Sequence, residues 1–496
     1  MEQKKRKLTD QELARRAKLP RYEALGVSPF GHKFERNTVA VDVKEKYKDY
    51  SEEQLSEMEE TLILAGRIRF IRKMGKASFF NIQDKTGMFQ CYIRIDSAGE
   101  ENYKVFKLSD LGDIVGVEGK LMKTRTGELT LRVSKFTHLT KALKPLPEKF
   151  HGLTDVEERY RKRYLDLIMN DEARRIAFMR PKIIRDIQNY LDQRGFTEVE
   201  TSILQSILGG AAARPFITHH NALDKDFYLR IATELSLKKL VVGGMERVYE
   251  IGRAFRNEGM DTTHNPEYTS LEIYQAYGDL QSMIELTEEM FRMIAIDVTG
   301  GTKITWLGNE IDVGPEFRKA SMVELIKEKT GIDFVAVTST EEALELAKEH
   351  QVPVEKHFTY GHVINAFFEK YVEDSLIQPT IVYGHPIEIT PLARKDEKDP
   401  RFTQRFELYI GCKEFCNAYT ELNDPLDQRA RFESQAKERA AGNDEANEID
   451  ESFLDALEYG LPPTGGIGFG IDRMIMFFTG TDSIRDVILF PTMKDR

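Results

Sequence analysis

The sequence has few cysteines, a single tryptophan and no long apolar run. Three cysteines among 496 residues cannot form a disulfide framework. Cys412 and Cys416 are four residues apart without nearby histidines, so they are weak candidates for a metal site. No stretch of about 18 apolar residues could span a bilayer. These absences exclude a disulfide-rich secreted domain and argue against a membrane protein.

The first residues, Met1 to Lys7, are mostly charged and lack the apolar segment of a secretory signal. We therefore expect a cytoplasmic protein with no membrane partner. Hydrophobic residues make up 41% of the chain and charged residues 31%, which is typical of a globular protein. At this length the chain is predicted to contain more than one domain.

Charge is distributed unevenly along the chain. Residues 1–144 contain 29 lysines and arginines against 21 acidic residues, a net charge of +8. The remaining residues contain 42 against 61, a net charge of −19. The amino-terminal part is therefore the better candidate for a nucleic-acid-binding face. The acidic part is explained equally well as a surface that keeps a large domain soluble.

The pattern of the amino-terminal part changes near residue 60. Before it, an amphipathic helical pattern is interrupted by Pro20 and ends at Gly26. After it, five short strand-like runs separated by turn residues lie between Leu62 and Phe136, which favours a small closed barrel of the OB type. The predicted domains are a basic helical extension (residues 1–60), an OB-fold barrel (61–147) and a larger carboxy-terminal domain (148–496).

The most informative motif is a predicted hairpin in the carboxy-terminal domain. Val248 to Phe255 and Tyr268 to Tyr277 read as two strands that flank a polar turn. Residues two apart on a strand share a face, so Glu272 and Tyr274 point the same way. With the distant Gly466-Ile-Gly-Phe-Gly-Ile-Asp-Arg473, this hairpin resembles motifs 2 and 3 of class II aminoacyl-tRNA synthetases, and most closely those of the bacterial lysyl-tRNA synthetases.

The resemblance covers essentially the whole chain and implies an α+β fold, in which an antiparallel sheet with flanking helices follows the OB barrel. A helix from Ile176 to Gly195 and a strand from Phe196 to Leu204 resemble motif 1, which implies a homodimer. Ser202 stands where the family has a proline. The motifs correspond to about residues 180–204 for motif 1, 248–277 for motif 2 and 465–480 for motif 3.

The resemblance also implies an ATP site with two catalytic arginines. Arg256 would hold the α-phosphate and the substrate carboxylate, and Arg473 would cover the adenine opposite Tyr268. Thr263 stands where relatives often carry a cation. The implied ATP-binding residues are Arg256, Glu258, His264, Asn265, Tyr268, Glu407 and Arg473. Glu407 and Glu414 match the carboxylates that bind Mg²⁺ together with the triphosphate.

A second implied site would bind L-lysine. Carboxylates beside aromatic rings suit an ammonium group on an apolar stem, and related aspartyl enzymes carry an arginine near the position of Glu421. Without the resemblance, Asn417, Tyr419 and Glu421 are explained equally well as one solvated strand face, because they lie two residues apart. The implied lysine-binding residues are Gly210, Ala211, Glu234, Glu272, Tyr274, Asn417, Tyr419 and Glu421.

Three barrel residues match the family's anticodon-binding positions: Phe79, Gln90 and Glu128. An aromatic ring can stack on an unpaired base, and Gln and Glu can read its edge. Phe79 is explained equally well as a residue of the barrel core.

The reaction implied by the resemblance joins lysine and ATP into lysyl-adenylate and then transfers lysine to the 3′ end of tRNA(Lys). Two alternatives stay open. The first is a tRNA-binding relative with weakened catalysis, which the departures at Thr263 and Ser202 favour. The second is a lysine ligase that modifies a protein, although such relatives typically lack the barrel predicted here.

Overall fold

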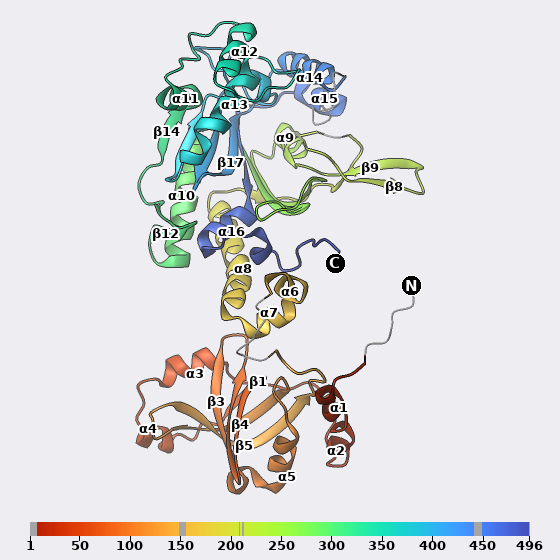
Figure 1. The fold of residues 1–496 in the computed structure, drawn as a ribbon, viewed down its shortest axis with the longest axis vertical. Coiled ribbons are helices and arrows are strands. Elements are labelled where there is room, and N and C mark those ends of the chain that lie inside the picture. The colour runs from red at the N-terminus through yellow and green to blue at the C-terminus, as the bar shows by residue number, and fades with distance from the viewer. Residues whose placement is uncertain (1–6, 148–154, 208, 211–212, 441–448, 496) are drawn as a thin grey trace. The chain divides into compact units, whose positions relative to one another are not determined.

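A computed structural model describes residues 7–147, 155–207, 209–210, 213–440 and 449–495. The chain divides into two compact units, Met1–Thr154 and Asp155–Arg496 (Figure 1). None of the described helices is long and apolar enough to cross a bilayer.

The first unit contains a closed barrel with the strand order β1-β2-β3-β5-β4. Only β3 and β5 pair in parallel among these neighbours. All five predicted strands are present, and the last of them, β5, runs beyond the predicted Phe136 to Thr140. The strands are β1 (Leu62–Met74), β2 (Ala77–Gln83), β3 (Met88–Arg94), β4 (Ile114–Lys123) and β5 (Leu129–Thr140).

Helices cover this barrel and share its core. Tyr22, Val43, Tyr47 and Leu55 belong to the same buried apolar cluster as the inward-facing strand residues. The described part of the predicted extension therefore packs on the barrel as one body, because its apolar side chains are buried there. The helices are α1 (Asp10–Arg16), α2 (Leu19–Glu23), α3 (Ala40–Tyr47), α4 (Glu52–Glu57) and α5 (Ile95–Leu108).

The second unit is built on a mostly antiparallel sheet with the order β14-β15-β16-β17-β18-β11-β10-β6. Its two edge pairs, β14 with β15 and β10 with β6, are parallel. The strands are β6 (Thr197–Glu198), β10 (Arg247–Phe255), β11 (Glu267–Ala276), β14 (Arg318–Ser321), β15 (Thr380–Tyr383), β16 (Arg405–Ile410), β17 (Lys413–Thr420) and β18 (Thr464–Gly470).

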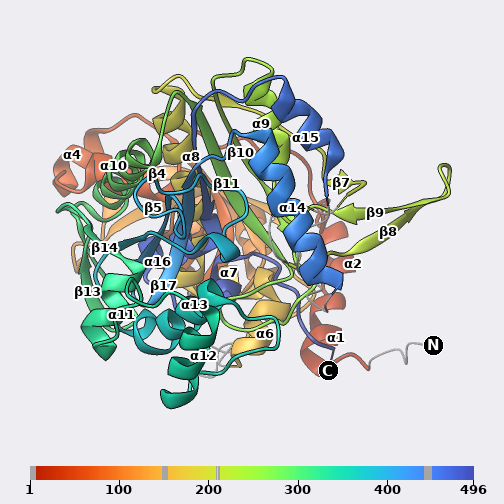
Figure 2. The same cartoon turned by 90° about the horizontal axis from the view of Figure 1, so that it is seen from above.

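Two smaller sheets accompany the main sheet. The β8 and β9 strands form a hairpin that extends away from it (Figure 2). The strands of these small sheets are β7 (Leu204–Gln205), β8 (Ile217–His220), β9 (Lys225–Leu229), β12 (Lys303–Trp306) and β13 (Asn309–Asp312).

Helices complete the second unit. They are α6 (Val156–Arg161), α7 (Arg163–Met169), α8 (Asp171–Asp192), α9 (Glu234–Val242), α10 (Leu280–Thr299), α11 (Met322–Thr330), α12 (Thr340–Glu349), α13 (Tyr360–Tyr371), α14 (Pro425–Ala440), α15 (Glu451–Glu458), α16 (Ile471–Thr479) and α17 (Ile484–Val487), with short 3-10 turns at Glu373–Ser375 and Ile387–Ile389.

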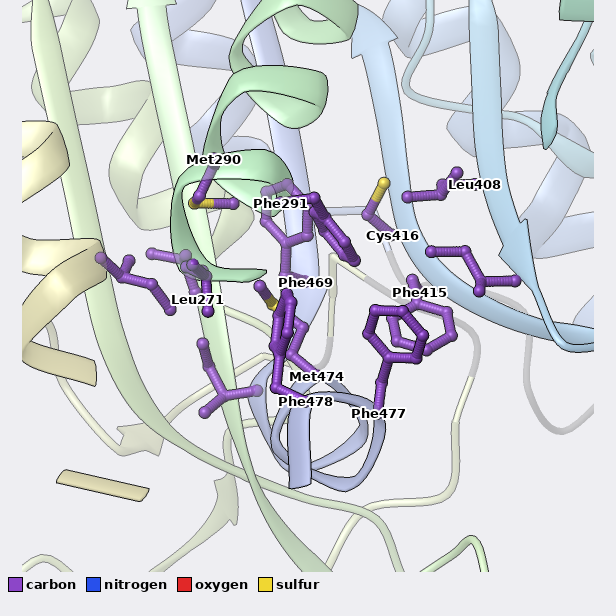
Figure 3. Packing of buried hydrophobic residues seen from close by; sticks show 14 of the residues in the cluster. Leu271, Met290, Phe291, Leu408, Phe415, Cys416, Phe469, Met474, Phe477 and Phe478 are labelled. Atoms are coloured by element: carbon purple, nitrogen blue, oxygen red, sulfur yellow. The ribbon is translucent and has the colours of Figure 1, made fainter. Parts of the chain in front are cut away.

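One face of the main sheet packs against α10 and α16. Phe291 of α10 lies beside Phe469 of β18, with ring centroids 6.3 Å apart, and beside Phe478 of α16, at 5.6 Å (Figure 3). Because strand residues alternate between faces, the neighbours of these apolar side chains point to the opposite side. The core on one face therefore positions polar side chains on the other.

The predicted motif 1 strand, Phe196 to Leu204, is wrong for most of its length. Only Thr197–Glu198 pairs with β10, as β6. Further along, the backbone amide of Thr201 donates to the Glu250 carboxylate (3.1 Å), and its hydroxyl donates to the same oxygen (2.7 Å). A side chain thus takes the place of a neighbouring strand for this segment.

Candidate functional site

Two rows of residues cross the main sheet on the face away from the α10 core. Backbone pairing places each row side by side across four strands. Their residues, Gly466 excepted, form the floor of a cavity of about 630 Å³. From β11 to β16, one row is Glu272, Gly468, Asn417 and Glu407, and the next is Tyr274, Gly466, Tyr419 and Arg405.

The cavity brings together nearly all the residues that the sequence assigned to ATP, lysine and metal. Ala211 lies outside the described residues. Glu421 is 1% exposed and is not among the lining residues. The predicted residues that line the cavity are Gly210, Glu234, Arg256, Glu258, His264, Asn265, Tyr268, Glu272, Tyr274, Glu407, Glu414, Asn417, Tyr419 and Arg473.

The two arginines lie at the polar end of this cavity. The guanidinium of Arg256 lies over the ring of Tyr268, with 5.3 Å from its carbon to the ring centroid. Its Nε is buried and has no hydrogen-bond partner. Arg473 donates to the backbone carbonyl of Glu414. A buried guanidinium nitrogen without a partner is costly, so this end of the cavity is prepared for an anion.

A polar turn presents two further lining residues, Thr263 and His264. The Asp261 carboxylate accepts hydrogen bonds from both of their backbone amides, at 2.6 and 2.7 Å, and lies 2.9 Å from His264 Nδ1. Burial raises the pKa of Asp261, but these hydrogen bonds outweigh it and hold the pKa well below the ordinary value. The ionised side chain thus fixes the shape of the turn.

Asp472 fixes the backbone beside Arg473. Its carboxylate accepts from the backbone amide of Thr269 on β11 (2.7 Å) and from Arg180 on α8 (2.5 Å). It is 2% exposed. The start of α16 is therefore tied to two other elements, and Arg473 enters the cavity from a fixed point.

Glu407 and Glu414 form the acidic wall of the cavity. Arg405, which the sequence analysis did not single out, donates to the Glu407 carboxylate (2.5 Å) and to Asn417 Oδ1 (2.9 Å). Burial acts to raise the pKa of Glu407, but Arg405 and His385 hold it below the ordinary value. Burial, and after it the charge of Glu407, raise the pKa of Glu414 to about 7. The charge of Glu407 is thus balanced by Arg405, whereas Glu414 is left to bind a cation.

The opposite end of the cavity is lined by buried acids and tyrosines. The Glu272 carboxylate accepts from the backbone amide of Thr233 (2.9 Å) and from the Tyr274 hydroxyl (3.2 Å). Burial raises the pKa of Glu272 to about 7. A buried carboxyl group with few partners favours a ligand that carries positive charge.

Behind this end lies an ion-pair cluster that the sequence analysis missed. Lys238, fully buried on α9, lies 2.5 Å from Glu234 and also pairs with Glu421. Burial acts to lower the pKa of Lys238, but the two carboxylates raise it above the ordinary value, so the lysine stays charged. The available signal was the four-residue spacing of Glu234 and Lys238 on one helix.

The three predicted anticodon residues lie in the first unit, on the outside of the barrel. Phe80 points into the core and is fully buried, whereas its neighbour Phe79 faces outward against Tyr92, with ring centroids 4.7 Å apart. The core explanation for Phe79 is therefore wrong. Gln90 and Glu128 line an open cavity of about 450 Å³ on the same unit, which Phe79 does not line.

Comparison with known proteins gives two family matches. Residues 155–494 match the tRNA synthetases class II (D, K and N), and residues 62–139 match the OB-fold nucleic acid binding domain. The chain is 58% identical to a lysine–tRNA ligase of Streptococcus sanguinis over 98% of both chains. It is 57% identical to that of Lactococcus lactis subsp. lactis, over 98% of this chain and 99% of the other. These matches confirm the fold class predicted from the sequence.

Proposed function

The chain belongs to the lysine–tRNA ligases of the class II tRNA synthetase family, and from this premise we propose how its residues perform the ATP-dependent attachment of lysine to tRNA(Lys). The observation that carries the assignment is the charge distribution of one cavity. Its polar end holds Arg256 with an unpartnered buried Nε, and its other end holds the buried carboxyl group of Glu272. Such a cavity suits a substrate with an anionic end and a cationic end.

In the first step a carboxylate oxygen of lysine forms a bond to the α-phosphorus of ATP, and the bond to pyrophosphate breaks. Negative charge gathers where two anions meet. Arg256 lies within the cavity with free donors and offsets this charge by holding the phosphate and the carboxylate together. Arg473 and Tyr268 bind the adenine between them. Glu258, His264 and Asn265 complete the ATP-binding set.

In the second step the 3′-terminal ribose hydroxyl of tRNA attacks the carbonyl carbon of lysyl-adenylate, and AMP leaves. Neither step needs a covalent enzyme nucleophile. The contribution of the protein is positioning and charge stabilisation, which together account for large rate enhancements in acyl and phosphoryl transfer.

Lysine is selected at the acidic end of the cavity. Glu234 and Glu272 receive its ammonium groups, and the rings of Tyr274 and Tyr419 cover its apolar stem. Glu421 does not line the cavity, and it contributes through its ion pair with Lys238. Gly210, with a backbone φ of +90° that suits glycine, lets the loop approach the substrate closely. Ala211 and Asn417 complete the proposed lysine-binding set.

Glu407 and Glu414 would hold Mg²⁺. Two carboxylates are few ligands, which suits an ion that keeps several waters and shares oxygens of a triphosphate. The raised pKa of Glu414 fits this assignment, because a second carboxylate beside Glu407 needs a cation to ionise readily at neutral pH. When bound, the ion would neutralise charge on the triphosphate.

The barrel of the first unit would read the anticodon. Phe79 offers an outward-facing ring for stacking, and Gln90 and Glu128 offer polar groups for base edges. We further propose a homodimer formed through the motif 1 region, which sedimentation equilibrium tests, and a cytoplasmic location.

The direct test of this function is charging of purified tRNA with labelled lysine. The full-length protein is expected to attach lysine to tRNA(Lys) in an ATP-dependent reaction. Exchange of the anticodon bases for others should reduce charging. Binding of tRNA without charging would favour the weakened relative, and lysine transfer to protein instead of tRNA would favour the protein-modifying ligase.

A further inference from the structure

We propose that Lys44 of α3 and Lys48, which caps the carboxyl end of that helix, hold the RNA backbone beside the bases read by the barrel. The inference rests on the proposed role of the barrel in anticodon binding. It adds a phosphate-binding edge, supplied by the helical segment that precedes the barrel. The family motif did not single out this edge.

The cavity on the barrel surface joins α3 to three strands. Gln90 of β3 and the turn residue Glu128 line it together with the two lysines. Its volume is about 450 Å³. The lining residues are Lys44, Lys48, Asn81, Met88, Gln90, Glu128 and Leu129.

Helix α3 is fastened to the barrel, so its lysines have a fixed place. The backbone amide of Ala40 at its first turn donates to the Asp84 carboxylate (2.8 Å), and that of Val41 donates to the Thr86 hydroxyl (3.1 Å). On its inner face, Val43 and Tyr47 are buried in the barrel core. A helix held at its first turn and along one face presents its other face to solvent in a single orientation.

Lys44 and Lys48 are four residues apart and both exposed, so they lie one above the other on that face. Neither has an ion-pair partner within the described residues of the first unit. The lysine between them, Lys46, differs, because its ammonium lies 3.2 Å from the Glu60 carboxylate. The two cavity lysines are thus free cations at fixed positions, one helical turn apart.

The remaining lining groups favour RNA over an acidic peptide. Gln90 donates through its Nε2 to the Thr130 hydroxyl (2.8 Å), which leaves its carbonyl oxygen to accept from a base edge. Asn81 pairs with Gln90 across the strands, and the aromatic pair of Phe79 and Tyr92 is the next pair on the same face. Two residues along a strand span about 7 Å. Stacking rings, base-reading amides and phosphate-binding cations therefore follow one another along the face.

The test compares two double variants of the full-length protein with equal charge. K44Q/K48Q removes the cavity lysines. K33Q/K46Q removes two exposed lysines of the same unit that pair with Glu35 and Glu60. The measured quantities are the KM for tRNA in lysine charging between 0.05 and 0.3 M KCl, and tRNA retention on filters.

We expect K44Q/K48Q to raise the KM for tRNA about tenfold at roughly 0.1 M salt and to reduce the slope of log affinity against log salt by about 1.4, because each phosphate contact on a single strand contributes about 0.7. The control variant, K33Q/K46Q, should change the KM for tRNA less than about twofold. K44R/K48R should restore tRNA binding. Lysine-dependent pyrophosphate exchange, which needs no tRNA, should stay unchanged in all three.

Equal effects of the two glutamine doubles would overturn the inference, since general attraction to the basic unit would then account for the binding. No effect of K44Q/K48Q would overturn it as well. If the unaltered protein shows no lysine-dependent exchange, the proposed function fails instead. Filter retention of tRNA on the variants still decides the inference in that case.

Discussion

The ammonium of Lys238 lies 2.5 Å from the carboxylate of Glu234, on the same helix and out of reach of solvent. The same ammonium also pairs with Glu421. One internal cation therefore balances one of these two carboxylates and leaves the other uncompensated. Of the two, Glu234 lines the cavity, and we propose that the substrate ammonium supplies the missing positive charge there.

Substitution of Lys238 should destabilise the second unit strongly. Lys238→Met keeps the length of the side chain but leaves two buried carboxylates without their cation, and we expect a loss of about 3–5 kcal/mol. Trp306 is the single tryptophan of the chain and is buried in the second unit, so its fluorescence reports unfolding of that unit in urea.

The neighbouring residue Lys239 provides the control. Its ammonium lies 3.7 Å from Asp450 and its side chain is 33% exposed, so Lys239→Met should cost less than about 1 kcal/mol. Equal losses for the two variants would contradict the role given to Lys238.

Removal of the Glu272 charge should weaken lysine binding specifically. Glu272→Gln keeps the shape and an acceptor for the Thr233 amide but loses the negative charge. A hydrogen bond to a charged group contributes about 1.5–3 kcal/mol, so the KM for lysine in pyrophosphate exchange should rise roughly 10- to 100-fold. The KM for ATP should change little. A change confined to the KM for ATP would show that Glu272 does not contact lysine.

Lysine binding should strengthen as pH rises through neutrality. Burial raises the pKa of Glu272 to about 7 in the ligand-free protein, so its ionised fraction grows from about a tenth at pH 6 to about nine tenths at pH 8. The ionised form attracts the ammonium, and the KM for lysine should therefore fall about tenfold over this interval at saturating ATP. In Glu272→Gln the KM for lysine should no longer depend on pH over this interval. Glu414, whose pKa is also raised to about 7, still titrates in that variant.

The raised pKa of Glu272 also affects folding stability. Lysine binding strengthens as pH rises, but the stability contributed by this group falls. Between about pH 4.5 and 7 the unfolded chain has released the proton of Glu272 and the folded chain still holds it. The contribution of this group to stability therefore falls as pH rises through that window. Added lysine should offset the loss, and a thermal unfolding series with and without lysine measures both effects.

Two glycines of β18 should respond differently to a methyl group. A Cβ at Gly466 would lie 2.0 Å from Glu421 Oε1 and 2.5 Å from the Tyr274 ring. Gly466→Ala should therefore cost about 1–3 kcal/mol and raise the KM for lysine. At Gly468 the nearest atom would be the Glu272 side chain at 3.6 Å, an ordinary contact. Gly468→Ala should leave Trp306-monitored unfolding nearly unchanged, and equal destabilisation would refute the crowding at Gly466.

Local patterns were sufficient for the barrel strands and the motif 2 hairpin, because turn residues and alternation determine both. They could not decide whether Phe79 faces the barrel core or the outside, since a shift of one residue in register exchanges the two faces. Helix α5 was missed because Gly99, with φ of +79°, interrupts its helical pattern.

The cavity residues that motifs identified are those with characteristic neighbours in sequence. Arg405 became visible only through the pairing of β16 with β17, which brings it to Asn417 and Glu407. The pairing of Lys238 with Glu421 joins a helix to a distant strand end. In sequence, Glu234 and Lys238 look like an ordinary exposed helix pair, because burial depends on tertiary packing.

We propose that this cavity activates lysine with ATP. The most direct measurement is the exchange of labelled pyrophosphate into ATP by the purified protein without tRNA, with lysine, aspartate or asparagine supplied separately. We expect exchange with lysine alone, reduced at least about 100-fold in Arg256→Gln. Exchange supported by aspartate or asparagine would contradict selection of lysine by the cavity, and no exchange with any of the three would contradict activation of an amino acid there.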